Sequence, residues 1–346
     1  MRKEDMRKAD EDLIDPVNGY HIPPLWLERS SILDIRERIE SGLWVLLSDG
    51  QLLRRGYTTG TTAAAACKGA VMSLRSPVEE VEVPTPAGIR VKLVVHGRKG
   101  SCLAIKDGGD HEFDLTSGLE VLAVAMQSCE TEIVAGEGIG RITRKGLWIP
   151  IGKPAISQSA NRAIHDAIIE GLEEAGLSGA RVELSLPRGR KIAPLTHNPE
   201  VGVEGGLSIL GSTGFVEPWN EHMGECTAEK IADLDKVVVT TGRIGLRYSR
   251  VLFPNHTAVL LGNRLDLLRL RPEQDSVICG LPGLILRWAL PDILQGSGYA
   301  TVGELAQADP GDPAIDRALD RLRARLPKTR IVLIDRIGRV IRDVIP

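Results

Sequence analysis

The spacing of apolar residues predicts a mixed chain in which helices alternate with short strands. Residues 61–74 include four consecutive alanines and read as a helix with small residues on most of its faces. The stretch SANRAIHDAIIEGLEEAGL has apolar residues at helical spacing from Ala163 to Leu172, which predicts an amphipathic helix that stops at Gly176. Residues 78–106 alternate between apolar and polar positions, a pattern typical of antiparallel strands joined by Gly and Pro turns.

The pattern changes near residue 234. A buried strand, a Gly-containing loop and a helix are expected in DKVVVTTGRIGLRYSRVL, and the form recurs in HTAVLLGNRLDLLRL and DSVICGLPGLILRWAL. TRIVLIDRIGRVI supplies a last strand, and residues 309–328 predict a charged helix. Such units in series are typical of a small parallel sheet of Rossmann type. We therefore predict an α+β domain over residues 51–233, followed by a smaller α/β Rossmann-like domain over residues 234–346.

The first 50 residues fit neither pattern. Residues 1–12 are almost all charged or polar, and we expect them to be disordered. A helix capped by Ser30 or Ser31 is expected to end at Gly42, and LWVLLSDG reads as a short strand and turn. We treat residues 1–50 as an N-terminal extension that packs on the main body.

Length and composition narrow the class of protein. A chain of 346 residues is long enough for two domains. A net charge of −3 and an aromatic content of 3% argue against a surface that binds nucleic acid. The five cysteines are scattered without zinc-ligand spacing, and no run of about 18 apolar residues predicts a membrane span. We expect a cytoplasmic protein that has no membrane or nucleic-acid partner, and the sequence leaves its oligomeric state open.

The stretch LRRGYTTGTTAAAA combines hydroxyls and small residues at a predicted helix start. The threonines can cap the helix, and Gly60 would let a ligand approach the backbone. Arg54 and Arg55 add positive charge, which suits a carboxylate or phosphate. Two interpretations remain open: an anion-binding turn, or a capped core helix whose arginines face solvent.

The loop IKDGGDHEFDLTSG follows a predicted strand. Lys106, Asp107, Asp110, Glu112 and Asp114 cluster in it, and such groups can act as general acid and base or bind a cation. The spacing of a calcium loop is absent, and we expect no metal bound by the protein. The alternative is a solvated turn, because Asp and Gly are common turn residues.

Two further loops are weaker candidates, and a third is the best candidate for a cofactor loop. In GEGIGRITRKG, Glu137 and Arg141 can face a ligand, although a hairpin bend is the commoner explanation for glycines between two strands. GGLSILGSTGFVEP gathers small and hydroxyl residues before Glu217, and it is either a ligand loop or a domain crossover. In VVVTTGRIGLR a buried strand leads to Gly242 and Gly245 at a helix start, which suits a ligand that contains adenosine.

Several of these stretches occur together in one known family. LRRGYTTGTTAAAA, IKDGGDHEFDLTSG, GEGIGRITRKGLWIPIGKPAI and THNPEVGVEGGLSILGSTGFVEP follow one another in the same order. In these stretches the chain resembles the cobalt-precorrin-5B C(1)-methyltransferases (CbiD) of anaerobic cobalamin biosynthesis. The resemblance is strong from Leu52 to Glu221 and weak from there to about residue 297.

The resemblance implies a reaction and its ligands. The methyl donor would be S-adenosylmethionine, and the acceptor would be cobalt-precorrin-5B, a tetrapyrrole that carries acetate and propionate groups. Methyl transfer to ring carbon 1 would give cobalt-precorrin-6A. The resemblance also implies an α+β domain followed by a Rossmann-like domain. Because the sulfonium is already a good leaving group, the protein would mainly align the donor with the carbon nucleophile.

The same resemblance suggests site residues. Asp107 and Asp110 are the candidate catalytic residues. The expected acceptor-binding residues are Arg55, Tyr57, Thr58, Thr59, Gly60, Thr61, Lys106, Asp114, Glu137, Arg141, Thr213 and Glu217. The expected donor-binding residues are Thr241, Gly242, Gly245, Gly262 and Asn263.

The chain also departs from the family pattern. His111, Glu112 and Phe113 stand in the acidic loop where the family has Asp-Pro, with one residue inserted. Leu281 and Leu284 replace polar residues of a later Gly-rich motif, so we expect a divergent member with an altered C-terminal domain. Two alternatives follow: a paralogue that methylates another modified tetrapyrrole, or a tetrapyrrole-binding protein without catalytic activity.

Overall fold

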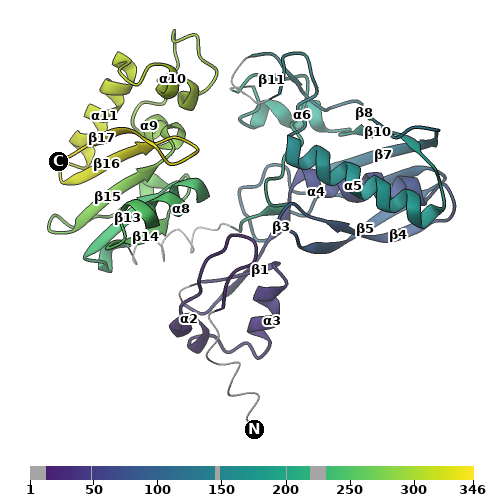
Figure 1. Ribbon diagram of the computed structural model, residues 1–346, viewed down its shortest axis with the longest axis horizontal. Coiled ribbons are helices and arrows are strands. Elements are labelled where there is room, and N and C mark those ends of the chain that lie inside the picture. The colour runs from purple at the N-terminus through teal and green to yellow at the C-terminus, as the bar shows by residue number, and fades with distance from the viewer. Residues whose placement is uncertain (1–12, 48, 145–148, 200, 219–230) are drawn as a thin grey trace. The chain divides into compact units, whose positions relative to one another are not determined.

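The chain has a mixed α/β fold in two compact units, Met1–Asn220 and Glu221–Pro346 (Figure 1). The computed structural model describes residues 13–47, 49–144, 149–199, 201–218 and 231–346. The expected disorder of residues 1–12 therefore lies outside the described residues. The boundary expected at 233/234 falls within the second unit. Each unit has its own hydrophobic core.

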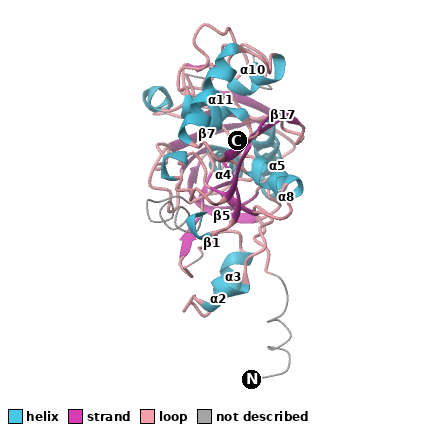
Figure 2. Cartoon of the chain, turned by 90° about the vertical axis from the view of Figure 1, so that its left-hand side faces the viewer, coloured by secondary structure: helices cyan, strands magenta, loops and turns pink. Residues whose placement is uncertain are grey.

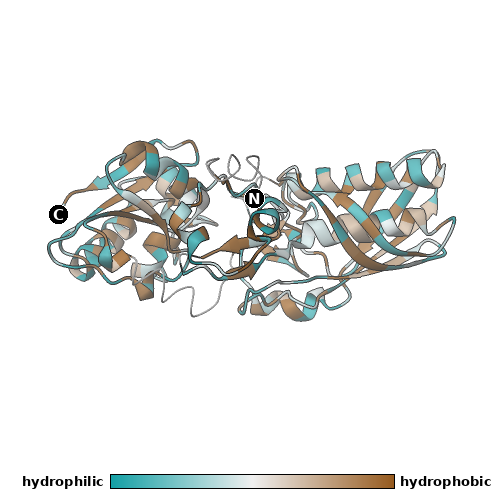
Figure 3. Cartoon of the chain, turned by 90° about the horizontal axis from the view of Figure 1, so that it is seen from below, coloured by the Kyte–Doolittle hydropathy of each residue, from teal (hydrophilic) through white to brown (hydrophobic). Residues whose placement is uncertain are grey.

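A six-stranded sheet of mixed orientation forms the base of the first unit. Its strands, in spatial order, are β4 (Val78–Pro84), β5 (Arg90–Arg98), β6 (Ser101–Ile105), β7 (Glu120–Gln127), β10 (Ala180–Ser185) and β8 (Glu132–Ala135). All neighbours pair antiparallel except β8, which runs parallel to β10. Every second residue of β5 is buried, so one face of the sheet carries the core (Figure 3).

The alanine-rich segment forms helix α4 (Thr59–Met72), which is buried from Thr59 to Val71. It packs against the sheet and against helix α5 (Gln158–Ala175). A helix enclosed in this way is apolar or small on all faces, which explains the four alanines. A Cβ atom at Gly60 would lie 2.9 Å from the Cβ of Ala160, so the two helices approach closely at this point.

Helix α5 begins at a serine cap and ends where its sequence predicts. The Ser157 hydroxyl caps it by accepting a hydrogen bond from the N–H of Ala160 at 3.3 Å. Gly176 ends it in the left-handed conformation, with φ of 63°, which confirms the predicted stop.

The N-terminal segment has a small core of its own, formed by Leu13, Ile22, Ile35, Ile39 and Leu46. Its helices α2 (Pro24–Glu28) and α3 (Ile35–Glu40) lie close together (Figure 2). The helix expected to be capped by Ser30 or Ser31 begins later, after Asp34. Pro24 starts a separate helix, and the N–H of Ser30 still donates to Leu27 at its end. Strand β1 (Trp44–Leu46) pairs with β2 (Leu52–Arg54) on the other side of residue 50. This pairing joins the N-terminal segment to the rest of the first unit.

Short elements complete the first unit. Strand β3 (Gly56–Tyr57) pairs with β12 (Phe215–Val216), and β9 (Arg141–Ile142) pairs with β11 (Val203–Glu204). Helix α6 (Gly189–Ile192) and the 3-10 turn η2 (Ala193–Leu195) follow β10. In the described part of the chain, no helix has both the length and the apolar character needed to cross a bilayer.

A five-stranded sheet organises the second unit. Its spatial order is β14 (Thr257–Leu260), β13 (Lys236–Thr240), β15 (Asp275–Gly280), β16 (Thr329–Ile334) and β17 (Val340–Val344). The first four strands are parallel, and β17 is antiparallel to β16. Of the described residues from 236 onward, the helices are α8 (Arg243–Leu252), α9 (Pro282–Ala289), α10 (Val302–Ala308) and α11 (Pro313–Arg325).

Two expectations for this unit were wrong. No helix follows β14, where the chain forms only the 3-10 turn η3 (Leu265–Leu267) before Pro272 interrupts it. TRIVLIDRIGRVI forms the hairpin of β16 and β17 rather than one strand, because the chain reverses between Asp335 and Gly338.

Candidate functional site

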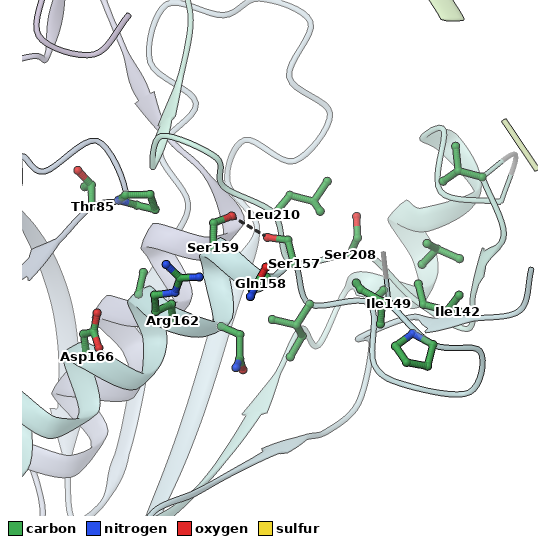
Figure 4. Close-up of a pocket in the computed structure, with 18 of the residues that line it drawn as sticks. Thr85, Ile142, Ile149, Ser157, Gln158, Ser159, Arg162, Asp166, Ser208 and Leu210 are labelled. Atoms are coloured by element: carbon green, nitrogen blue, oxygen red, sulfur yellow. Dashed lines mark hydrogen bonds between the residues drawn. The ribbon is translucent and has the colours of Figure 1, made fainter. Parts of the chain in front are cut away.

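The first unit contains a cavity of about 900 Å³ beside the start of α5 (Figure 4). This volume lies within the range of about 300–1,000 Å³ that is common for ligand pockets. Its apolar lining includes Ile142, Ile149, Pro150, Ile156, Val203 and Leu210. Its polar lining includes Thr85, Ser157, Gln158, Ser159, Asn161, Arg162, Asp166 and Ser208. In Figure 4, Arg162 and Asp166 lie on the α5 side, and Ile142 and Ile149 lie on the opposite side.

Backbone pairing fixes the segments that meet at this cavity. The N–H of Ser157 donates to the carbonyl of Ile209 at 2.9 Å, and the N–H of Ile209 donates to Ala155 at 2.8 Å. The hydroxyls of Ser157 and Ser159 lie 3.2 Å apart and share a hydrogen bond. The wall is therefore built from the start of α5 and a loop about fifty residues away along the chain.

The threonine-rich turn supports this wall from behind. The hydroxyl of Thr59 accepts a hydrogen bond from the N–H of Leu210 at 2.9 Å, and the N–H of Gly60 donates to Leu210 at 2.8 Å. Thr58 and Thr61 are bonded to the carbonyl of Gly214, at 3.0 Å from the Thr58 N–H and 2.7 Å from the Thr61 hydroxyl. These groups at the start of α4 are thus satisfied within the protein. The contacts favour the capped-helix interpretation of the turn, but its expectation that the arginines face solvent is wrong for Arg55, which is buried.

The two arginines before this turn have different environments. Arg55 is completely buried, and its guanidinium donates to Asp15 at 2.5 Å, to Glu217 at 3.0 Å and to the carbonyl of Gly42 at 3.0 Å. The expected contact of Arg55 with a substrate anion is therefore not available in this structure. Glu217, another expected acceptor residue, is the partner of this arginine.

The acidic loop is held by ion pairs. Both oxygens of Asp107 accept hydrogen bonds from Arg54, at 2.6 and 2.8 Å, and this pairing holds the pKa of Asp107 below its usual range. The carboxylate of Asp110 accepts from the N–H of Arg54 at 2.7 Å. These bonds anchor the loop to β2, and a catalytic role for Asp107 and Asp110 stays a prediction.

The same loop contains a second ion pair, between the side chains of Lys106 and Asp114. Burial disfavours the ionised carboxylate of Asp114, but hydrogen bonds from Lys106 and Thr116 outweigh it and lower its pKa. Tyr57 donates its N–H to the carbonyl of Asp107 at 2.8 Å, and burial raises the pKa of its phenol. Lys106 and Tyr57 are both buried, and through their contacts with Asp114 and Asp107 they stabilise the loop.

The remaining expected acceptor residues lie in separate places. Glu137 is exposed, and exposed Arg141 donates to the carbonyl of Gly152 at 3.0 Å. Thr213 accepts from the N–H of Phe215 at 3.3 Å. All the predicted acceptor and catalytic residues belong to the described part of the chain, and none of them lines the cavity. Sequence reasoning identified α5 only as an amphipathic helix and missed the Ser, Gln, Asn and Arg residues at its start as candidate site residues.

The expected donor residues lie beyond the carboxyl ends of neighbouring strands in the second sheet. Thr241 and Gly242 follow β13, and Gly262 and Asn263 follow its parallel neighbour β14. Gly245 packs its Cα against the hydroxyl of Thr240, which leaves no room for a side chain. The chain crosses from one side of β13 to the other between β14 and β15, and such a switch in strand order is a common ligand-binding position.

Within the described residues, no group of three or more His, Cys, Asp or Glu side chains is arranged to hold a metal ion.

Comparison with known proteins gives full-length matches. The family model named CbiD matches residues 47–218. The chain is 49% identical over 333 residues to the cobalt-precorrin-5B C(1)-methyltransferase of Methanococcoides burtonii, covering 96% of this chain and 98% of that protein. It is 46% identical to the protein of the same name from Methanosarcina acetivorans, covering 96% and 98%. Because these matches span 96% of the chain, most of residues 1–50 have counterparts in these relatives.

A solved structure agrees with these matches. The crystal structure of the cobalamin biosynthesis protein cbiD from Archaeoglobus fulgidus is 34% identical, with a TM-score of 0.69. The likeness covers 93% of this chain and 100% of that chain. Both the sequence and the fold match over nearly the whole length. The chain belongs to the CbiD family.

Proposed function

We propose that this protein transfers a methyl group to carbon 1 of cobalt-precorrin-5B in cobalamin biosynthesis. The observation that carries the proposal is the likeness over nearly the full length to relatives named for this reaction. The chain is a methyltransferase of that family. A paralogue with another tetrapyrrole, or a protein that only binds one, has no comparable support.

The cavity of the first unit is the proposed acceptor site. A tetrapyrrole has an apolar ring and charged carboxylate side chains, and this cavity has an apolar wall and a polar wall. Its volume of about 900 Å³ suits a large ligand that leaves part of its rim in solvent. The threonine-rich turn and the loop anchored by Asp107 and Asp110 act as supports for the unit that contains this site.

The second unit is the proposed donor site, with a Rossmann-like arrangement that holds S-adenosylmethionine. Thr241, Gly242 and Gly245 would lie against the donor at the end of β13. Gly262 and Asn263 would complete the site from β14. A backbone without bulky side chains at the ends of parallel strands lets an adenosine ligand approach closely.

The chemistry requires little covalent help from the protein. The S–CH₃ bond of the donor breaks as the new C–C bond forms, and the electron pair stays on sulfur to give a neutral thioether. The ring gains a methyl cation equivalent, and the proton that it gives up passes to water. The main demand is an in-line approach with the reacting carbons about 3–3.5 Å apart.

The test is a reaction with S-adenosylmethionine whose methyl group is isotopically labelled. Purified protein with cobalt-precorrin-5B should give a product that carries one labelled methyl group, located at carbon 1 by NMR, with one equivalent of S-adenosylhomocysteine. The control is the same reaction without the protein, which should give no labelled product. Turnover only with another macrocycle would favour the paralogue. Tight macrocycle binding by folded protein without any product would favour the binding protein.

A further inference from the structure

The charge on the cavity wall is concentrated at two neighbouring positions. Of the described residues that line the cavity, Arg162 and Asp166 are the two that are charged. They lie four residues apart on α5 and therefore on the same face of the helix. The rest of the lining is apolar, hydroxyl or amide. A charged group of the ligand therefore meets a single cation on this wall.

The side chain of Arg162 has no partner within the part of the chain that the structure describes. It makes no hydrogen bond and no ion pair there, and Asp166 is instead 3.8 Å from its neighbour His165. Arg54 and Arg90 of the same unit are engaged, with Asp107 and Glu170, and what distinguishes Arg162 from exposed arginines such as Arg98 is its position on the cavity wall. Arg162 is exposed, so its five N–H donors are available to a ligand.

We infer that Arg162 is a specificity residue that binds a carboxylate on an acetate or propionate side chain of the macrocycle. This inference rests on the proposed function and names the contact that selects the acceptor. A guanidinium binds a carboxylate through two parallel charge-assisted hydrogen bonds, whereas it gains much less from a neutral amide. The apolar wall around Ile142 and Ile149 then holds the ring, and Arg162 sets which edge of the ring enters.

The experiment compares two corrinoids on the purified full-length protein. One has free acetate and propionate carboxylates, and the other has the same ring with these groups converted to amides. Arg162→Gln should weaken binding of the carboxylated corrinoid about 10- to 100-fold and change binding of the amide by less than about twofold. Arg162→Lys should restore part of the affinity, because it keeps the positive charge. The restoration should be incomplete, because a lysine ammonium cannot form the bidentate pair. The matched control is Arg98→Gln, an exposed arginine on β5 outside the cavity, which should bind both ligands like the wild type.

A second variant should change affinity in the opposite direction. Asp166→Asn removes the negative charge that shares the wall, so the carboxylated corrinoid should bind roughly two- to fivefold more tightly. The amide corrinoid should respond much less. Added salt should reduce the difference between the two ligands.

The outcomes separate this inference from the proposed function. If the wild type binds and methylates the acceptor while Arg162→Gln binds the carboxylated corrinoid equally well, the inference is overturned and the function stands. Equal losses for both corrinoids would also overturn it, because they indicate a change in the cavity rather than a lost carboxylate contact. If folded wild-type protein binds neither corrinoid, the proposed function fails together with the inference.

Discussion

At the scale of single residues, burial decides what a charged side chain does. Arg54 and Arg55 are adjacent in the sequence, and both pair with carboxylates. The pair of Arg54 and Asp107 is partly exposed, at 36% and 42%, and water screens it. Arg55 has no exposed surface and Asp15 only 5%, so removing the cation leaves a carboxylate in the protein interior.

We expect Arg55→Gln to lower the free energy of unfolding of the first unit by about 3–5 kcal/mol. Arg54→Gln is the matched control and should cost about 1 kcal/mol or less. Hydrogen exchange of the α4 amides measures this unit separately from the other. Equal losses in the two variants would mean that burial does not set the strength of these pairs.

Gly60 illustrates close packing at one residue. A methyl group here would lie 2.9 Å from both the Cβ of Ala160 and the carbonyl of Leu210. Gly60→Ala should therefore destabilise the first unit by about 1–3 kcal/mol and weaken acceptor binding, since Leu210 lines the cavity. Gly283→Ala, where nothing lies within 4 Å, is the control and should change the stability of the second unit by about 0.5 kcal/mol at most. A Gly60→Ala variant as stable as the wild type would show that α4 and α5 can separate freely.

At the scale of elements, buried and half-buried charges join α4, α5 and the sheet. Nearly buried Lys68 on α4 lies 2.9 Å from Glu170 and 2.7 Å from Glu174, both on α5. Arg90 on β5 lies 2.9 Å from Glu170 and also pairs with Glu82 on β4. Glu170 is thus the carboxylate that both cations share.

Glu170 makes the stability of the first unit depend on pH in a defined window. Hydrogen bonding to Arg90, followed by that to Lys68, lowers its pKa from 4.5 to about 2. A lowered carboxyl pKa stabilises the folded state above the unfolded value and loses that contribution as the pH falls toward 2. Glu170→Gln should therefore be about 1–3 kcal/mol less stable than wild type at neutral pH, with the difference vanishing between pH 4.5 and 2. Denaturation at several pH values measures this, and a difference that stays constant with pH would contradict it.

The sequence predicted the elements better than the site. The Gly176 stop of α5 is a local signal, and it is confirmed. The turn before α4 left two interpretations open because its hydrogen-bond partners, Leu210 and Gly214, lie about 150 residues away along the chain. The cavity was missed for the same reason, since it is assembled from segments far apart in the sequence. The helix expected after β14 failed because buried leucines fit a short 3-10 turn as well as a helix.

At the scale of the whole molecule, each unit has a main hydrophobic core of its own. In the first unit this core joins α4, α5 and the mixed sheet, and in the second unit buried clusters pack on the mainly parallel sheet. A ligand that binds one unit stabilises the structure it contacts by mass action. The proposed division of donor and acceptor therefore has a measurable signature.

We expect S-adenosylhomocysteine at about 100 times its dissociation constant to stabilise the second unit by about 2.7 kcal/mol. Hydrogen exchange should slow at the ends of β13 and β14, including residues 240–242. Cobalt-precorrin-5B should slow exchange at the start of α5 instead. Protection by S-adenosylhomocysteine confined to the first unit would place the donor elsewhere, and an unrelated nucleotide serves as the control ligand.

The contacts of Arg55 also have a consequence for how the chain is made. Asp15 leaves the ribosome early, but Glu217 is synthesised 162 residues after Arg55. Because domains generally fold during synthesis from the N-terminus, the nascent first unit holds its buried cation with one carboxylate until the last part of the unit emerges. A product of premature termination before residue 217 thus keeps Asp15 but lacks the second carboxylate that binds Arg55, which leaves it open to proteolysis.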